Sequence, residues 1–130
     1  MGTWQYLGLG DFLAIAVVNT SFDGRDLADN DAVIARAQAG LWAPTSTAYT
    51  DLVAKAAILE YSLIRNRPLP GSNVVVAHEC MKEFAWRNGF YFDRELDDAD
   101  PDPLFRAIIA GDPDALDRLA AWLKKTLVQY

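Results

Sequence analysis

Apolar residues recur every three or four positions along most of the chain, which is the spacing of an α-helix that buries one face. The strongest pattern runs over Asp51–Asn66, where a stripe of leucine and alanine is widened by neighbouring apolar side chains. A helix that is apolar over so much of its circumference belongs at the centre of a bundle. The pattern predicts an all-α fold of about six helices. These are Asp11–Asn19, Asp31–Ala37, Asp51–Asn66, Ser72–Asn88, a helix from Pro101 or Asp102 to Ala110, and Asp114–Gln129.

Capping and breaking residues indicate where these helices begin and end. Asn30 is expected to cap the second helix and Ser72 the fourth, because short polar side chains satisfy free N–H groups of a first turn. Asp112 followed by Pro113 predicts a cap and a first helical residue for the last helix. Three segments remain outside the helices: a turn at Ser21–Arg25, a loop at Gly40–Thr47, and Phe90–Phe92, which is too short for more than a marginal extended piece.

Composition narrows the class of protein. The 130 residues suit a single domain, and 52% apolar with 23% charged residues is the balance of a folded globular chain. A net charge of −6 argues against nucleic-acid binding and fits a soluble protein or one with a basic partner. The sequence contains no signal-peptide pattern and no apolar run of about 18 residues, so we expect no membrane span. Cys80 is the only cysteine, so we expect no internal disulfide and a cytoplasmic protein.

A motif lies where the two central helices meet, at Arg65–Ala77, with the sequence RNRPLPGSNVVVA. It resembles R-N-H-P-F-x-D-G-N-K-R-T-A, the signature of the Fic/Doc family, which comprises the filamentation and death-on-curing proteins. In this register Arg67 stands at the position of the catalytic histidine and Gly71 at that of the metal-binding aspartate. Two valines replace the two phosphate-binding cations. The matching positions are Arg65, Asn66, Pro68, Asn73 and Ala77.

Further pieces of the chain resemble the same family in the same order. No single piece is specific, but together they span nearly the whole sequence. The resemblance therefore implies that residues 1–130 form one death-on-curing-like helical bundle of the Fic/Doc type. The pieces are Tyr6-Leu7 with Asp11–Ala16, Ala35-Arg36 with Gln38-Ala39, Lys55–Ala57, Arg87–Gly89, and Leu119-Ala120 with Trp122-Leu123.

The family's chemistry needs groups that this motif lacks. In the family, the loop and the following helix hold a nucleoside triphosphate with Mg²⁺, and the histidine takes a proton from a hydroxyl of a target protein, to which AMP or a phosphate is transferred. Arg67 stays protonated and cannot accept that proton. Gly71 offers no metal ligand, and Val74 and Val75 offer no charge to phosphate. The resemblance thus implies a pseudoenzyme without nucleotide-dependent transfer, and we predict neither a metal nor a cofactor.

Two functions are favoured over a third, a toxin that retains transfer activity through unrecognised residues. The first is a ligand-binding or regulatory module, with a toxin–antitoxin system as one origin, that takes a small molecule or a protein partner in the motif pocket. The alternative is a repurposed enzyme that acts on a small, partly apolar metabolite of a biosynthetic pathway, with Arg67 and Asn73 orienting it or stabilising an oxyanion. The candidate ligand-binding residues are Arg67, Ser72, Asn73, Asn66 and Trp42, the last of which resembles the family's flap.

Plainer explanations of the same residues also stand. Arg67 is equally well explained as a surface arginine, and the amide of Asn73 either contacts a ligand or is satisfied by loop backbone. Ser72 is more often only a cap, and a lone loop aromatic such as Trp42 could fold back over the core. His78, the only histidine, lies beyond the motif and is predicted to occupy an ordinary surface or core position.

Overall fold

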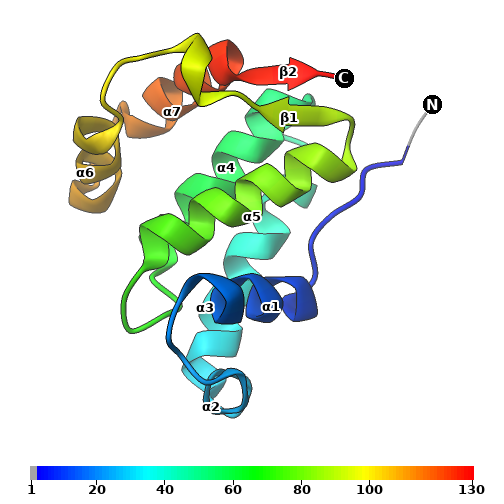
Figure 1. The fold of residues 1–130 in the computed structure, drawn as a ribbon, viewed down its shortest axis with the longest axis vertical. Helices are drawn as coiled ribbons and strands as arrows, with labels where there is room; N and C mark the ends of the chain where they lie inside the picture. Colours follow the sequence, from blue (N-terminus) through cyan, green and yellow to red (C-terminus); the bar gives the residue numbers. More distant parts are fainter. Residues whose placement is uncertain (1–2) are drawn as a thin grey trace.

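The computed structural model describes residues 3–130, and over these residues the chain is mostly helical (Figure 1). The α-helices are α1 (Leu9–Asn19), α2 (Gly24–Ala28), α3 (Asp31–Trp42), α4 (Leu52–Asn66), α5 (Asn73–Arg87), α6 (Asp102–Ala110) and α7 (Ala115–Thr126). Two 3₁₀ turns, η1 (Ala43–Thr45) and η2 (Arg94–Leu96), and two strands, β1 (Phe90–Phe92) and β2 (Leu127–Gln129), complete the order. The predicted helical character is confirmed. None of the helices within residues 3–130 combines the length and the apolar character needed to cross a membrane.

The core is organised around α4. Figure 1 shows α4 and α5 crossing at the centre, with α1, α2 and α3 towards one end and α6, α7 and the two strands towards the other. α4 packs against α3, α5 and α7, and its Leu59 and Leu63 are fully buried, as is Phe84 of α5. Burying one such side chain stabilises the fold by about 1.5–3 kcal/mol. The apolar stripe predicted for Asp51–Asn66 therefore faces this core.

One segment predicted to be a turn begins a helix. Asp23 Oδ1 accepts hydrogen bonds from the N–H groups of Arg25, at 2.8 Å, and Asp26, at 3.3 Å. These bonds cap α2, so the Asp23-Gly24 pair within Ser21–Arg25 starts a short helix instead of closing a turn. The prediction of a simple turn at this position is wrong.

The predicted loop at Gly40–Thr47 is also largely helical, because α3 continues to Trp42 and η1 follows it. Gly40 lies inside α3, at the point where α3 approaches α4. A Cβ atom added to Gly40 would lie 2.6 Å from Cδ2 of Leu63, closer than atoms normally approach. Glycine is used here for close helix packing, a role that local sequence does not distinguish from a helix stop.

The end of the last predicted helix is a strand. α7 stops at Thr126, and β2 pairs with β1 in an antiparallel ladder that sets Phe92 opposite Leu127 and Phe90 opposite Gln129. The prediction of helix through Gln129 is wrong, and the marginal extended piece at Phe90–Phe92 is a real strand. Each strand supplies the other's backbone hydrogen bonds, and a pairing between such distant segments leaves no local signal.

The predicted caps have different outcomes. Asn30 is confirmed, since its Oδ1 accepts hydrogen bonds from two N–H groups in the first turn of α3, at 3.0 and 3.2 Å. Ser72 stands at the N-cap position of α5, but its side chain makes no capping hydrogen bond and its backbone is left-handed. The cap position of α7 is Asp114, two residues after the predicted Asp112.

Candidate functional site

The motif forms the tight loop between α4 and α5. Immediately after Asn66, the last residue of α4, Arg67 adopts the left-handed conformation (φ 48°), and its N–H donates to the carbonyl of Leu63 at 3.3 Å. Ser72, at the other end of the loop, is also left-handed (φ 62°). A residue with a side chain pays about 1–2 kcal/mol for this conformation. The loop therefore has a defined shape that its surroundings must hold.

The side-chain amide of Asn73 holds part of that shape. Its Oδ1 accepts a hydrogen bond from the N–H of Leu69 at 2.9 Å, and its Nδ2 donates to the carbonyl of the same residue at 3.0 Å. Leu69 is itself buried. Both hydrogen-bonding groups of the amide are thus used inside the loop. This geometry gives Asn73 a structural role, the plainer of the two that the sequence left open.

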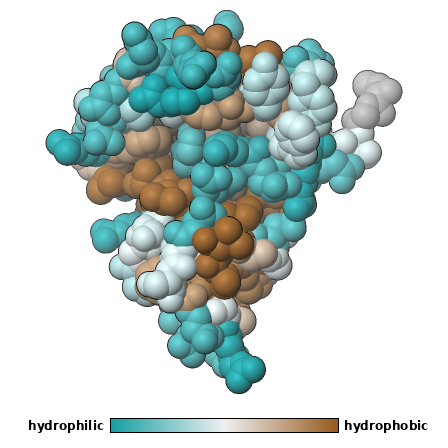
Figure 2. All heavy atoms as spheres, viewed as in Figure 1, coloured by the Kyte–Doolittle hydropathy of each residue, from teal (hydrophilic) through white to brown (hydrophobic). Residues whose placement is uncertain are grey.

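A hollow of about 290 Å³ lies beside the loop, and we call it the apolar hollow. Figure 2 shows hydrophobic surface in this region, between α6 and the start of α5. Val75 and Ile109 are each about half exposed here. The apolar part of the lining comes from Ile64, Pro70, Val74, Val75 and Ile109, and the polar part from Arg67, Ser72 and Asn73.

A second hollow, of about 420 Å³, shares Arg67 with the first, and we call it the basic hollow. Arg36 of α3, Asn66 and Leu69 complete its lining, and Asn66 Nδ2 donates to the backbone carbonyl of Arg36 at 3.3 Å. Within residues 3–130 neither the Arg36 nor the Arg67 guanidinium forms a hydrogen bond or an ion pair. Two arginines without carboxylate partners line this one hollow, and their charge favours an anion there although the net charge of the chain is −6.

Four of the five predicted site residues meet at these hollows. Arg67 lines both, and Asn66 lines the basic hollow. Ser72 and Asn73 line the apolar hollow. Trp42 lines neither, and stands at the end of α3 with 65% of its surface exposed. The resemblance to a flap over the motif pocket is therefore not matched by its position.

Two lining residues come from elements far from the loop in the sequence. Arg36 belongs to α3 and Ile109 to α6. For Arg36, the sequence signal is that the surrounding segment resembles the family pattern. Nothing in the sequence distinguishes Ile109 from any other apolar residue near a helix end, so only the packing of α6 against the loop reveals it.

A buried polar contact joins the two central helices, and the sequence did not predict it. Glu60 of α4 is 0% exposed, and its Oε2 lies 2.9 Å from Nδ1 of His78 on α5. The available signal was an acidic residue within an otherwise apolar helix, since unpaired carboxylates are almost never buried. The nearby thiol is unreactive, because burial, with the charge of Glu60, raises the pKa of Cys80 to about 12.

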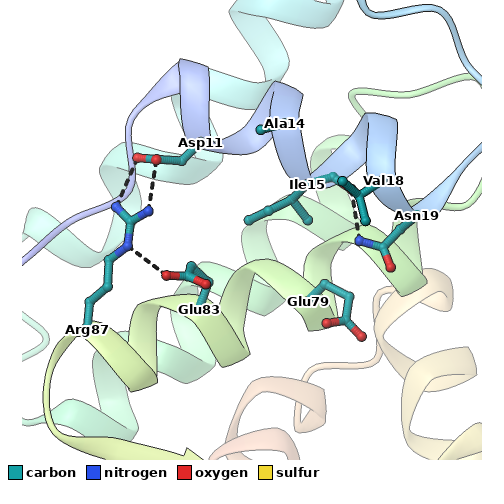
Figure 3. A pocket seen from close by; sticks show the side chains of 8 residues that line it. All are labelled: Asp11, Ala14, Ile15, Val18, Asn19, Glu79, Glu83 and Arg87. Atoms are coloured by element: carbon teal, nitrogen blue, oxygen red, sulfur yellow. Dashed lines mark hydrogen bonds and ion pairs between the residues drawn. The ribbon is translucent and has the colours of Figure 1, made fainter.

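A third hollow lies between α1 and α5, and charged side chains bound it (Figure 3). Arg87 donates to both carboxylate oxygens of Asp11, at 2.9 and 3.2 Å, and to Glu83 at 2.8 Å. Because its guanidinium is committed to two carboxylates, Arg87 is less available to a ligand than the arginines of the basic hollow. Hydrogen bonds from Arg87 and from the N–H of Gly8 lower the pKa of Asp11.

The Asp11–Arg87 pair predicts a pH-dependent contribution to stability. Because the folded-state pKa of Asp11 is lowered from the ordinary value of 3.8, the contribution is present above that value and is lost as the pH falls through the folded pKa. Both side chains are about a third exposed, so we expect Asp11→Asn to cost only about 0.5–1 kcal/mol at neutral pH. Urea unfolding of both proteins should show this gap closing below about pH 4. A gap independent of pH would contradict the assignment.

Comparison with known proteins adds no assignment: no family model matches the chain, and neither does any curated protein or solved structure.

Proposed function

We propose that this chain is a Fic/Doc-type protein that has lost nucleotide-dependent transfer and binds a small amphipathic anion at the motif loop. One observation carries the proposal: the apolar hollow and the basic hollow meet at Arg67, so an apolar surface and two arginines without carboxylate partners lie side by side. A cytoplasmic regulatory module of toxin–antitoxin ancestry would use such a ligand as its signal.

The lining of the loop supports the loss of transfer. Arg67 remains protonated and cannot serve as a base. Val74 and Val75, in the first turn of α5, put apolar surface where a triphosphate would need cations. The amide of Asn73 is taken up by Leu69, which also weakens the alternative of an enzyme that uses Arg67 and Asn73 to stabilise an oxyanion.

The same lining defines the ligand class. Each methylene group buried in the apolar hollow contributes about 0.8 kcal/mol to binding. A carboxylate held by a guanidinium adds a charge-assisted and often bidentate contact. A ligand that combines the two, such as a medium-chain or aromatic carboxylic acid, therefore fits better than either an uncharged apolar molecule or a small hydrophilic anion.

Calorimetric titration with octanoate tests this prediction. We expect octanoate to bind about tenfold or more tightly than octan-1-ol, which lacks the charge, and than acetate, which lacks the chain. Arg36→Gln combined with Arg67→Gln should reduce the affinity for octanoate to that for octan-1-ol. Val75→Asp should weaken octanoate binding by repulsion while leaving the helix start intact, because an acidic residue is favoured in a first turn.

Arg25→Ala is the matched control, since Arg25 lies on α2 and lines neither hollow. It should leave octanoate affinity unchanged. Equal affinities of the natural protein for octanoate and octan-1-ol would show that the negative charge does not contribute to binding. Absence of octanoate binding would overturn the proposed function. A titration with ATP that is tightened about tenfold or more by Mg²⁺ would instead restore the nucleotide site.

A further inference from the structure

The contact between Glu60 and His78 lies one helical turn along α4 and α5 from the apolar hollow. Glu60 precedes Ile64 by four residues on α4, and His78 follows Val74 by four residues on α5. Residues four apart lie on the same face of a helix, about 5–6 Å from each other. The Glu60–His78 pair is therefore a separate group of polar atoms, which lies beside the apolar hollow but is not part of its lining.

The polar atoms of this group are only partly satisfied. Glu60 is 0% exposed, and its Oε2 lies 2.9 Å from His78 Nδ1. Within residues 3–130, the buried side-chain nitrogen and oxygen atoms without a hydrogen-bond partner are Glu60 Oε1 and Trp122 Nε1. Leaving such a group unpaired costs about 1–3 kcal/mol. Glu60 and Trp122 both neighbour His78, Trp122 with ring centroids 5.9 Å apart, so the two unpaired atoms belong to residues around one imidazole.

The other ring nitrogen of His78 is not fully buried. The side chain is 22% exposed, and within residues 3–130 Nε2 forms no hydrogen bond, yet it is not among the buried atoms without a partner. Nδ1 faces the buried carboxylate, so Nε2 is the ring nitrogen that remains free for a second molecule.

Aromatic rings surround the imidazole. Phe92 is edge-to-face with it, with ring centroids 4.8 Å apart, and Phe105 is edge-to-face at 6.2 Å. Trp122 is stacked on it, with an angle of 30° between the ring planes and centroids 5.9 Å apart. Stacked and edge-to-face contacts of this kind favour another aromatic ring. They also restrict the orientation of the imidazole, which the Glu60 contact restricts further.

We propose that His78 is a catalytic nucleophile for acyl transfer from small aromatic esters to water, and that Glu60 is its positioning residue. In the neutral ring, Nδ1–H donates to Glu60 Oε2, which leaves the lone pair on Nε2. The activity goes beyond the ligand binding proposed above and does not depend on it.

The reaction balances with water as the only co-reactant. Nε2 attacks the ester carbonyl carbon, the bond from that carbon to the phenolic oxygen breaks, and the electron pair leaves with the phenolate. The acylated ring carries a positive charge, which the carboxylate of Glu60 offsets at 2.9 Å. Water then attacks the acyl carbon and gives up a proton to the phenolate, the C–N bond breaks with its electron pair returning to Nε2, and the carboxylic acid and the free imidazole are released.

Hydrolysis of p-nitrophenyl acetate tests the proposal, with 4-methylimidazole at the same concentration as reference. Because His78 is the only histidine, no other imidazole contributes. We expect the protein to react about 100-fold faster than 4-methylimidazole, and His78→Gln to reduce the rate to the uncatalysed background. Glu60→Gln should lower it about tenfold or more. Glu79→Gln is the matched control, because Glu79 is the next residue along α5 and pairs with Lys82; its rate should be unchanged.

A spectroscopic readout separates positioning by Glu60 from a structural role. In the natural protein, long-range ¹H–¹⁵N spectra of the single histidine should show the proton on Nδ1. Glu60→Gln should let the ring populate the Nε2–H form as well, because the glutamine amide can donate to Nδ1 as well as accept from it. Circular dichroism checks that each variant is folded.

Two measurements on the natural protein need no variant to fold. A rate no higher than that of 4-methylimidazole would overturn the proposal, and so would a proton found on Nε2. Full activity in folded His78→Gln would overturn it as well. Octanoate binding is measured separately, so failure of the esterase assay leaves the motif-loop site untouched.

Discussion

Replacing Phe84 with alanine is expected to lower the free energy of unfolding by about 3–5 kcal/mol. The Phe84 side chain is 0% exposed, and its ring packs against those of Trp4 and Tyr6, with centroids 6.5 and 6.0 Å apart. Alanine would lose the transfer free energy of the ring and leave a cavity between α5 and the N-terminal segment. Because domains are stable by only about 5–15 kcal/mol, the variant should lie close to its unfolding transition.

Urea unfolding followed by far-ultraviolet circular dichroism measures this loss. Val18→Ala on α1 is the control, since Val18 is also apolar but is largely exposed, and it should change the free energy by less than about 0.5 kcal/mol. If Phe84→Ala cost no more than this control, Phe84 would not be a core residue.

Gly40→Val should give the second large loss, about 3 kcal/mol, at the upper end of the range for overpacked cores. A Cβ on Gly40 would meet Leu63 Cδ2 at 2.6 Å and the backbone nitrogen of Leu63 at 3.3 Å. Leu63 is buried, and its backbone cannot move without displacing α4. Removing a glycine from a helix gains at most about 1 kcal/mol of propensity, so the steric clash decides the sign.

Gly10→Ala provides the opposite expectation within the same fold. Gly10 lies in α1, and no heavy atom stands within 4 Å of a Cβ built on it. Alanine there should stabilise the protein by about 0.5 kcal/mol through helix propensity alone. Thermal unfolding of the two variants should therefore move in opposite directions. A Gly40→Val variant as stable as the natural protein would show that α3 and α4 do not pack this closely.

The predicted helices that matched best are those with the longest regular patterns. The pattern over Asp51–Asn66 differs from α4 by one residue at its start, and the helix predicted over Ser72–Asn88 differs from α5 by one residue at each end. The predictions of secondary structure are wrong at a glycine and at a short segment, each of which is compatible with more than one local structure. The local sequence predicts a loop from Gly40 and a helix through Leu127–Gln129, because neither close packing nor strand pairing is visible within a few neighbouring residues.

The candidate site divides in the same way. The motif alone predicts that Arg67, Ser72 and Asn73 lie close together, because they share one loop. The pairing of Asn73 with the backbone of Leu69 was one of two open alternatives, and only the shape of the loop distinguishes them. Arg36 and Ile109 reach the loop from other helices.

By itself, the sequence determined the helical character, the two long central helices and the position of the loop between them. These features depend on spacing and on breaking residues that act within about one or two turns of the chain. The tertiary structure alone decided which distant residues join that loop, that Gly40 belongs to a helix, and that Glu60 faces His78 in the core. Such contacts form between surfaces from separate segments, and their partners are set by how whole helices pack.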